Sequence, residues 1–304
     1  MPKYLVRLLI DELLPWSSGK LFPLPMEIKV FATLNYYASG SCELHVGQDA
    51  LNTLTHAQLK QVIRETSELI ASHLASKYIV FPTTSGEITE TKNSFWERFG
   101  FTGIIGCIDG IQIPIIDFEG ESSHMFVNKL RQHSLNVMVI CDSKSYISNV
   151  NANFPGSCHD SYVWRMSNLS VHMENNYLDL HNDTYLIGDA NYPLQPWLMT
   201  PLQLPKRDKE LLYDSMHNQA WTITEHTAEL LRYTFKCLKG LPFDPVTAGH
   251  IIVSCCILHN MLVLSKEKYD VVKSERAEGL EDGSNSPTAI NIRDMTRLAK
   301  LVRE

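Results

Sequence analysis

The sequence contains an apolar, β-branched run with an acid at its centre: IIGCIDGIQIPI, residues 104–115. Short runs of this composition form strands that are buried within a sheet. A charged carboxylate inside such a strand is costly unless a partner stabilises it. Asp109 is therefore either a functional residue or the first residue of an Asp-Gly hairpin turn, since this pair favours type I′ turns.

Four segments after residue 100 have strand patterns. The first holds Asp109, and the fourth ends at Gly188-Asp189 because Pro193 cannot continue a ladder. Three strands, a helix starting near Asp160, a fourth strand and a later helix form the order of an RNase H-like α/β fold, a mixed sheet flanked by helices. In that fold the first and fourth strands are neighbours. The predicted strands lie at 103–115, 133–142, 145–154 and 183–193.

The first hundred residues have helical periodicity instead. Thr55 and Gln58 have the spacing of a capping box. Such helices form either a helix-turn-helix or a support for the domain that follows, and this part of the sequence favours support. The last segment is charged and rich in Ser and Gly, which predicts a flexible tail with a final short helix. The predicted division is a helical region at 1–100, an α/β domain at 101–265 and the tail at 266–304.

Charge and cysteine content narrow the classes of function. The chain has 27 basic and 34 acidic residues, a net charge of −7. Proteins that bind nucleic acid unaided usually have a basic excess, so DNA binding here would need a local basic groove or a basic partner. Seven cysteines without a CxxC pair favour neither a disulfide framework nor a zinc ribbon, and they indicate a reducing compartment. The apolar run at 251–264 is too short to span a bilayer and predicts a core helix, not a membrane segment.

Four acids stand at element ends or on a helix: Asp109, Asp160, Asp189 and Glu225. Each has a structural explanation when it is considered alone: a turn, a helix cap, a strand end and an exposed helix position. Together they match the acidic positions of an RNase H-like nuclease, with Asp109 and Asp189 side by side. Carboxylates that close repel one another, and a divalent cation relieves the repulsion. Oxygen ligands of this kind suit Mg²⁺ or Mn²⁺.

Several longer segments resemble the PIF/Harbinger transposases, and among them the Harbinger transposase-derived nucleases of animals. GFTGIIGCIDGIQIPI resembles the strand of the first catalytic aspartate, and FPGSCHDSYVWRMS resembles the Gly-Ser-x-His-Asp motif. YLIGDANYPLQPWLMTPL is similar to the block of the second aspartate and is the most specific match. NKLRQHSLNVMVICD, HIIVSCCILHN and LPMEIKVFATLNYYASGS resemble the second strand, the C-terminal helix and the leading, helix-turn-helix-like region.

The resemblance implies a metal-dependent DNA endonuclease of the DDE superfamily. Asp109, Asp189 and Glu225 match the three catalytic acids, and Asp160 matches a further acid of the metal site. Glu225 follows Asp189 by 36 positions, a usual interval for the superfamily. Around Glu225 the chain departs from the family, since Ala228 and Glu229 replace a Phe-Gly pair. The resemblance also implies Mg²⁺ or Mn²⁺ as cofactor, a Myb-like DNA-binding partner protein, and location in nucleus and cytoplasm; assembly into a homo-oligomer is left open.

Basic residues that could contact DNA phosphates fall in three groups. The alternative to DNA binding is that these basic residues simply form part of the solvated surface. His159 could donate to the scissile phosphate, although a structural role is favoured for it. The functions that remain open are the nuclease, a host-domesticated DNA- or protein-binding scaffold with little cleavage, and an RNase H-like hydrolase of RNA. The basic groups are Lys129 and Arg131; Lys206, Arg207 and Lys209; and Arg232, Lys236 and Lys239, whose spacing is that of one helix face. The helix predicted in this part of the chain covers 221–238.

Overall fold

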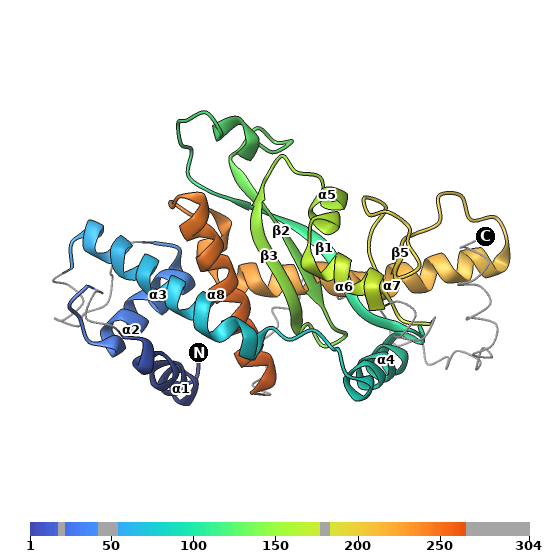
Figure 1. Cartoon of the computed structure of the whole chain (residues 1–304), viewed down its shortest axis with the longest axis horizontal. Helices are drawn as coiled ribbons and strands as arrows, with labels where there is room; N and C mark the ends of the chain where they lie inside the picture. Colours follow the sequence, from blue (N-terminus) through green and yellow to red (C-terminus); the bar gives the residue numbers. More distant parts are fainter. Residues whose placement is uncertain (18–21, 42–53, 177–182, 266–304) are drawn as a thin grey trace.

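A five-stranded mixed sheet forms the centre of the computed structural model, which describes residues 1–17, 22–41, 54–176 and 183–265 (Figure 1). The strand order is β3-β2-β1-β4-β5, so the first and fourth strands are neighbours as the sequence predicts. β1 pairs with β2 antiparallel and with β4 parallel, and β4 pairs with β5 parallel. The strands are β1 (Ile104–Pro114), β2 (Ser134–Cys141), β3 (Ile147–Pro155), β4 (Tyr185–Ile187) and β5 (Leu198–Met199). The RNase H-like α/β fold class is confirmed.

β1 is continuous through its acid. Asp109 pairs with Val139 and Gly110 with Met138 in one unbroken antiparallel register. An Asp-Gly hairpin turn at this position is therefore wrong, because pairing with β2 keeps the backbone extended through both residues. The excursion between β1 and β2 comes later and includes a short 3₁₀ helix, η2 (Ser123–Phe126).

Helices cover the two faces of the sheet, and each face buries its own apolar cluster. On one face Ile111 and Val139 pack with residues of α7 (Asp208–Thr234) and α8 (Pro245–Leu264). On the other face Ile108 and Met138 pack with Trp164 of α5 (Asp160–Arg165), which α6 (Asn168–Asn176) follows. Because side chains alternate along a strand, Asp109 points to the α7 face and Gly110 to the α5 face.

The N-terminal region consists of helices that pack on the sheet domain. α3 lies along α8, and Ser254 Oγ donates to the carbonyl of Ser67 at 3.0 Å (Figure 1). The predicted capping box of Thr55 and Gln58 is present at the start of α3. α1, α2 and α3 share one buried cluster with α8 and with β1 to β3, as expected of helices that support the domain. Ile88 and Phe95 of α4 belong to two other clusters. The N-terminal helices are α1 (Lys3–Leu13), η1 (Leu14–Trp16), α2 (Met26–Ser39), α3 (His56–Tyr78) and α4 (Ser85–Phe99).

α8 is the apolar core helix that the sequence predicts. It has 20 residues with a mean hydropathy of 1.7, so by length and composition it could cross a membrane, and the prediction that it is too short does not hold for the full helix. Its 18-residue apolar window is 72% buried inside the fold, against α3 and β3. His259 Nε2 donates to the Ser145 carbonyl at 2.6 Å. Packing therefore accounts for its apolar composition.

The helix predicted over 221–238 is wrong at both ends. α7 begins at Asp208 and ends at Thr234, and Phe235 leaves helical geometry with φ −114° and ψ 82°. Lys236 and Lys239 lie on a separate 3₁₀ helix, η3 (Lys236–Lys239), so they do not share a helix face with Arg232. The predicted tail at 266–304 and its short helix lie outside the described residues. The six cysteines within the described ranges are free thiols.

Candidate active site

Strand register brings Asp109 and Asp189 side by side. β1 and β4 run parallel with Cys107 opposite Ile187, and each acid follows its member of this pair by two residues. Gly188 fits closely there, since a Cβ on it would come within 2.8 Å of the Ile108 side chain. Neighbouring strands are about 4.8 Å apart. The two acids therefore stand next to each other, Asp109 in the middle of β1 and Asp189 just past the end of β4.

α7 carries Glu225 across the same strand. The indole Nε1 of Trp221 donates to the carbonyl of Ile108 at 3.2 Å, directly beside Asp109. One residue earlier, the Ala220 carbonyl accepts from Cys107 Sγ at 3.4 Å. Glu225 lies one helical turn beyond Trp221 and is exposed. Trp221 thus fixes the part of α7 from which Glu225 approaches.

Asp160 arrives from the opposite face of the sheet. It is the first residue of α5, and Asn136 Nδ2 donates to its Oδ1 at 2.7 Å. Gly110 makes this approach possible, because a Cβ there would stand 2.1 Å from the same oxygen. The helix cap is His159, whose side chain accepts from the Ser161 N–H. His159 is exposed and also lies 2.8 Å from Ser161 Oγ, so its observed contacts are those of a structural cap.

Electrostatics link the four acids. Burial is the largest cause that raises the pKa of Asp109, to about 7. The Gly110 N–H lowers this pKa, while the negative charges of the other three acids raise it further. Asp189, Asp160 and Glu225 are thus all near enough for their charges to act on Asp109. The sequence prediction that these distant acids crowd one another is reflected in this pKa.

Amide donors hold two of the carboxylates. Asp109 Oδ1 accepts from the Gly110 N–H at 2.8 Å. Asp189 accepts twice from Asn191, at 3.0 Å from its N–H and at 2.6 Å from its side-chain amide. Within the described ranges no three His, Cys, Asp or Glu side chains are grouped tightly enough to hold a metal ion. The donor type still fits a hard divalent cation, and Asp109 has the electrostatic crowding that such a cation would relieve.

Sequence reasoning missed the polar side chains that surround the acids. Asn136 is fully buried in β2 and positions Asp160. Its signal was available, since it is an amide inside an otherwise apolar strand. Tyr192 is 5% exposed, and its pKa is raised well above the usual value by burial and then by the charges of Asp160, Asp109 and Asp189. Nothing in the pattern GDANYP separates this tyrosine from an ordinary loop residue.

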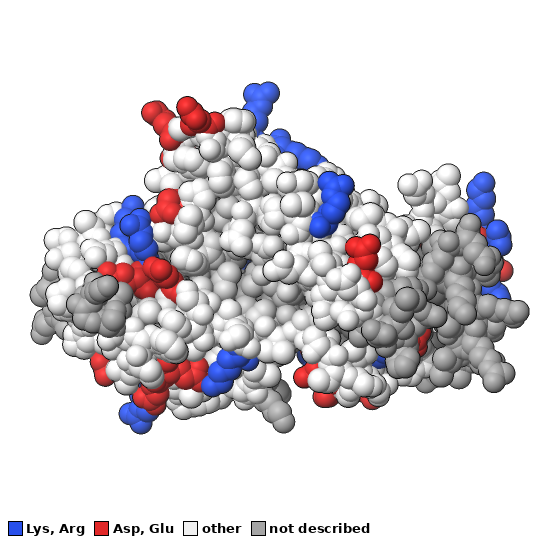
Figure 2. All heavy atoms as spheres, viewed as in Figure 1, with Lys and Arg blue, Asp and Glu red and all other residues white. Residues whose placement is uncertain are grey.

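The structure does not bring the predicted phosphate-contacting residues together. Lys129 and Arg131 are exposed at the excursion between β1 and β2. Lys206, Arg207 and Lys209 are exposed around the start of α7, about 25 Å along the helix from Glu225. Figure 2 shows Lys and Arg in separate small groups on the viewed face, without a continuous basic stripe. Arg232 and Lys236 lie near the other end of α7.

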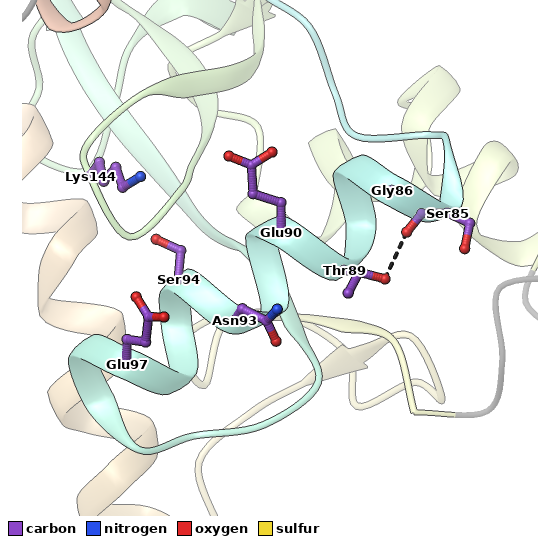
Figure 3. A pocket seen from close by; sticks show the side chains of 8 residues that line it. All are labelled: Ser85, Gly86, Thr89, Glu90, Asn93, Ser94, Glu97 and Lys144. Atoms are coloured by element: carbon purple, nitrogen blue, oxygen red, sulfur yellow. Dashed lines mark hydrogen bonds between the residues drawn. The ribbon is translucent and has the colours of Figure 1, made fainter.

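A surface hollow of about 590 Å³ lies along α4, away from the acids. Figure 3 shows side chains of α4 facing Lys144 across it. Its lining is polar and includes Glu90 and Glu97. None of the four acids contributes to it, so it is not the candidate site.

Comparison with known proteins identifies the family to which the sheet domain is similar. The family described as DDE superfamily endonuclease matches residues 108–260, a range that includes all four acids. The chain belongs to this family of DDE superfamily endonucleases. The prediction made from the sequence motifs is confirmed, and the chain is a member of a transposase-derived nuclease family.

Relatives of this DDE endonuclease chain occur in animals and plants. It is 34% identical to the human protein named "Putative nuclease HARBI1" over 239 residues, which is 77% of this chain and 66% of that protein. The protein of the same name from Xenopus laevis is 30% identical over 84% of this chain and 72% of its own length. "Protein ALP1-like" from Arabidopsis thaliana is 24% identical over 81% of this chain and 62% of its own length. The chain therefore spans about two thirds of the human relative's length, and no solved structure matches it.

Proposed function

We propose that this chain is a metal-dependent endonuclease that hydrolyses phosphodiester bonds of DNA by a two-metal mechanism. The observation that supports it is the convergence of four acids from separate elements, with the pKa of Asp109 raised to about 7. Asp109, Asp189 and Glu225 would hold the cations, and Asp160 would assist. The chemistry that bound cations would supply is activation of a water and stabilisation of charge on the departing 3′ oxygen.

Contacts within the chain position the four acids. Parallel pairing of β1 and β4 sets Asp109 beside Asp189. The hydrogen bond from Trp221 to Ile108 sets the crossing point of α7, and Asn136 sets Asp160. Four carboxylates repel DNA in the absence of cations. Substrate binding at this site is therefore expected to depend on the divalent ion.

A cleavage assay with Mg²⁺ or Mn²⁺ tests this function. Native chain should cut duplex DNA, and Asp189→Asn should lose cutting by a factor of at least about a hundred, because it removes one carboxylate charge from the site. The matched control is Asp183→Asn, an exposed acid that pairs with Lys92 at 3.1 Å just before β4. Equal activity of native chain and Asp189→Asn would contradict the proposal. An RNA/DNA hybrid in the same assay separates DNA from RNA as the substrate.

One observation favours a second function, the domesticated scaffold. Both oxygens of Asp189 accept hydrogen bonds from Asn191, so this acid is already satisfied without a cation. A scaffold would bind DNA or protein with no cleavage. Binding without metal-dependent cutting in the assay above would favour it over the nuclease.

We also propose that DNA recognition depends on a second protein, a Myb-like DNA-binding partner, and that the chain works in nucleus and cytoplasm. The net charge of −7 and the dispersed basic residues support a separate source of sequence recognition. Lys129→Ala with Arg131→Ala should weaken DNA binding equally for all sequences and reduce its salt dependence. If the chain alone binds a specific DNA sequence with high affinity, it needs no partner, and this proposal is wrong.

A further inference from the structure

The excursion between β1 and β2 carries a turn in which an exposed apolar side chain lies between two basic ones. Leu130 is 78% exposed, and its neighbours Lys129 and Arg131 are exposed as well. A single exposed leucine is common on protein surfaces. The flanking cations distinguish this one, because they attract a polyanion and bring the leucine against it. The turn therefore combines charge that suits DNA phosphates with an apolar tip.

A buried asparagine holds the turn in one conformation. Asn128 is 9% exposed, and its Oδ1 accepts from the Leu130 N–H at 2.8 Å and from the Gln132 N–H at 3.1 Å. Its carbonyl accepts from the Arg131 N–H at 3.0 Å. Arg131 has a φ of 62°, a left-handed conformation that residues other than glycine adopt rarely and only where the surroundings hold it. Leu130 thus projects from a turn whose shape is set before any ligand binds.

Hydrogen bonds connect the turn to the face of the sheet on which Asp160 lies. The side-chain amide of Asn128 donates to Ser134 Oγ at 3.0 Å. Ser134 Oγ in turn donates to Gln112 Oε1 at 2.6 Å. Gln112 of β1 pairs with Asn136 of β2, the residue that positions Asp160. Polar side chains on one face of the sheet therefore lead from the turn to the candidate active site.

The excursion also contacts the segment that leads into α5. The Ser157 N–H donates to the Met125 carbonyl of η2 at 3.2 Å, three residues before Asp160. In Figure 1 the excursion forms the top of the molecule, beyond the start of β2 and the end of β3. Its position relative to the acid of α5 is thus fixed from two sides, by the sheet and by this contact.

The distance from the acids to the turn suits one DNA duplex. Asp160 packs against Gly110 of β1. Gly110 lies four positions before Pro114, which pairs with Ser134 at the base of the turn. Four positions of a strand span about 13 Å, and a duplex covers this length in about four base pairs. A duplex that runs along β1 from the acids therefore reaches the turn.

We propose that Leu130 is a wedge that inserts between two base pairs of DNA bound at the four acids, while Lys129 and Arg131 contact phosphates beside it. This inference rests on the proposed nuclease function. Apolar side chains that enter the minor groove unstack base steps and kink the duplex. Insertion removes the Leu130 side chain from water, which offsets part of the cost of unstacking. The kink fixes the duplex at one position relative to the acids.

Leu130→Ala tests the wedge on a duplex with 2-aminopurine in place of the adenine of a central TA step. This step unstacks easily, and 2-aminopurine fluoresces more strongly when its stacking is lost. In Ca²⁺, used in place of Mg²⁺ to limit cutting, saturating native chain should raise the fluorescence, and Leu130→Ala should abolish the rise. No rise with the native chain, or an equal rise with Leu130→Ala, would overturn the proposal.

Leu204→Ala is the matched control. Leu204 is also 78% exposed and also has basic neighbours, Lys206 and Arg207. It precedes the start of α7, about 25 Å along that helix from Glu225. The control should therefore keep the native fluorescence. Both leucines are exposed, so neither variant should change the Tm. An equal loss of fluorescence in both variants would show that the effect is not specific to the turn, and the wedge would be wrong.

Affinity separates the apolar contact from the charges beside it. The dissociation constant of Leu130→Ala for the duplex should rise about tenfold, because the variant loses most of the apolar surface that insertion buries. The salt dependence of its binding should remain native, since no phosphate contact is lost. Lys129→Ala with Arg131→Ala should instead reduce the salt dependence. A reduced salt dependence in Leu130→Ala would mean that the leucine only shapes the turn, which contradicts the wedge.

Cleavage in Mg²⁺ distinguishes failure of the wedge from failure of the nuclease function. If the native chain cuts DNA and Leu130→Ala gives native fluorescence and affinity, the wedge is wrong and the nuclease stands. If the native chain raises the fluorescence without cutting, Leu130 is a wedge of a DNA-binding scaffold and the nuclease fails. If the native chain neither binds nor cuts DNA, both proposals fail. Unchanged DNA binding together with weaker self-association of Leu130→Ala would assign the turn to a contact between two copies of the chain.

Discussion

Asp109 makes stability depend on pH in a defined direction. Burial raises the pKa of its carboxyl to about 7, whereas an unfolded aspartate titrates at about 3.9. Its contribution to stability is therefore fully present below pH 4 and is lost as the pH rises through 7. Asp109→Asn should be more stable than the native chain above pH 7, by up to about 4 kcal/mol, and should lose this advantage near pH 4. Urea unfolding of both proteins across this pH range, without divalent cation, measures the difference in their free energies of unfolding. A difference that does not change with pH would contradict the raised pKa of Asp109 as its cause.

A divalent cation should narrow that difference in stability. Mg²⁺ at about a hundred times its dissociation constant would stabilise the native chain by about 2.7 kcal/mol. Mg²⁺ should stabilise Asp109→Asn much less, because this variant lacks a carboxylate charge that would bind the ion. Urea unfolding at pH 8 with and without Mg²⁺ checks this, and Asp208→Asn, at an exposed position, is the control. An equal Mg²⁺ response in native chain and Asp109→Asn would place the ion elsewhere.

Gly110 is required for the approach of Asp160. In Gly110→Ala the new Cβ would stand 2.1 Å from the carboxylate oxygen, so Asp160 must move and lose its bond to Asn136. We expect a stability loss of about 1–3 kcal/mol together with lower cleavage. Gly86→Ala is the control, since a Cβ at Gly86 meets nothing within 4 Å and the residue lies in α4. Thermal unfolding that leaves Gly110→Ala unchanged would show that Asp160 is not held as described.

The sequence predicts the positions of some residues of the site better than those of others. That Asp109 and Asp189 lie side by side follows from the order of the strands, because β1 and β4 are parallel neighbours. The Asp-Gly turn signal at 109 was misleading because it is local, while pairing with β2 decides the backbone there. Tyr192 could not be predicted, since its burial depends on a turn after Asp189 and on packing against α5.

β1 and β2 were predictable because apolar and β-branched residues persist over several positions. β4 keeps only Tyr185–Ile187 of the strand predicted at 183–193. β5 has two residues, Leu198 and Met199, too few for any pattern. The start of α7 was missed because Arg207 precedes it in place of a Ser, Thr, Asp or Asn cap. Its end was missed because Phe235 and Leu238 continue the apolar periodicity, yet they enter the core from η3 and not from the helix. Tertiary packing overrode the periodic signal there.

The crossing of α7 over β1 depends on Trp221. Trp221→Phe removes the Nε1–H that donates to the Ile108 carbonyl at 3.2 Å but keeps an aromatic ring. We expect a stability loss of about 1 kcal/mol and a fall in cleavage of about tenfold, because a displacement of α7 moves Glu225. The control is Trp96→Phe on the exposed surface of α4. Native-like cleavage by Trp221→Phe would show that Glu225 is positioned by other contacts.

The N-terminal helices and the sheet share their interior, and this bears on the predicted boundary near residue 100. Asn260 of α8 donates to the Tyr78 carbonyl at the end of α3 and to the Ile147 carbonyl at the start of β3, both at 2.6 Å. Its side-chain oxygen also accepts from the Ile147 N–H at 2.8 Å. One buried amide thus joins three elements from both sides of the boundary. An interior shared in this way is expected to unfold as one cooperative unit.

Ile63→Ala tests that cooperativity. Ile63 is fully buried in α3 within the cluster shared with β1 and β2, and its truncation should cost about 2–5 kcal/mol. If the chain unfolds as one unit, hydrogen exchange should accelerate by the same factor, at least about thirtyfold, in peptides from α3 and from β1. Arg64→Ala is the control, because its pair with Asp244 at 3.2 Å is exposed and contributes less than about 1 kcal/mol. Faster exchange in α3 with unchanged exchange in β1 would mean that the helical region opens separately, and residues 1–100 would then be an independent unit attached to the nuclease fold.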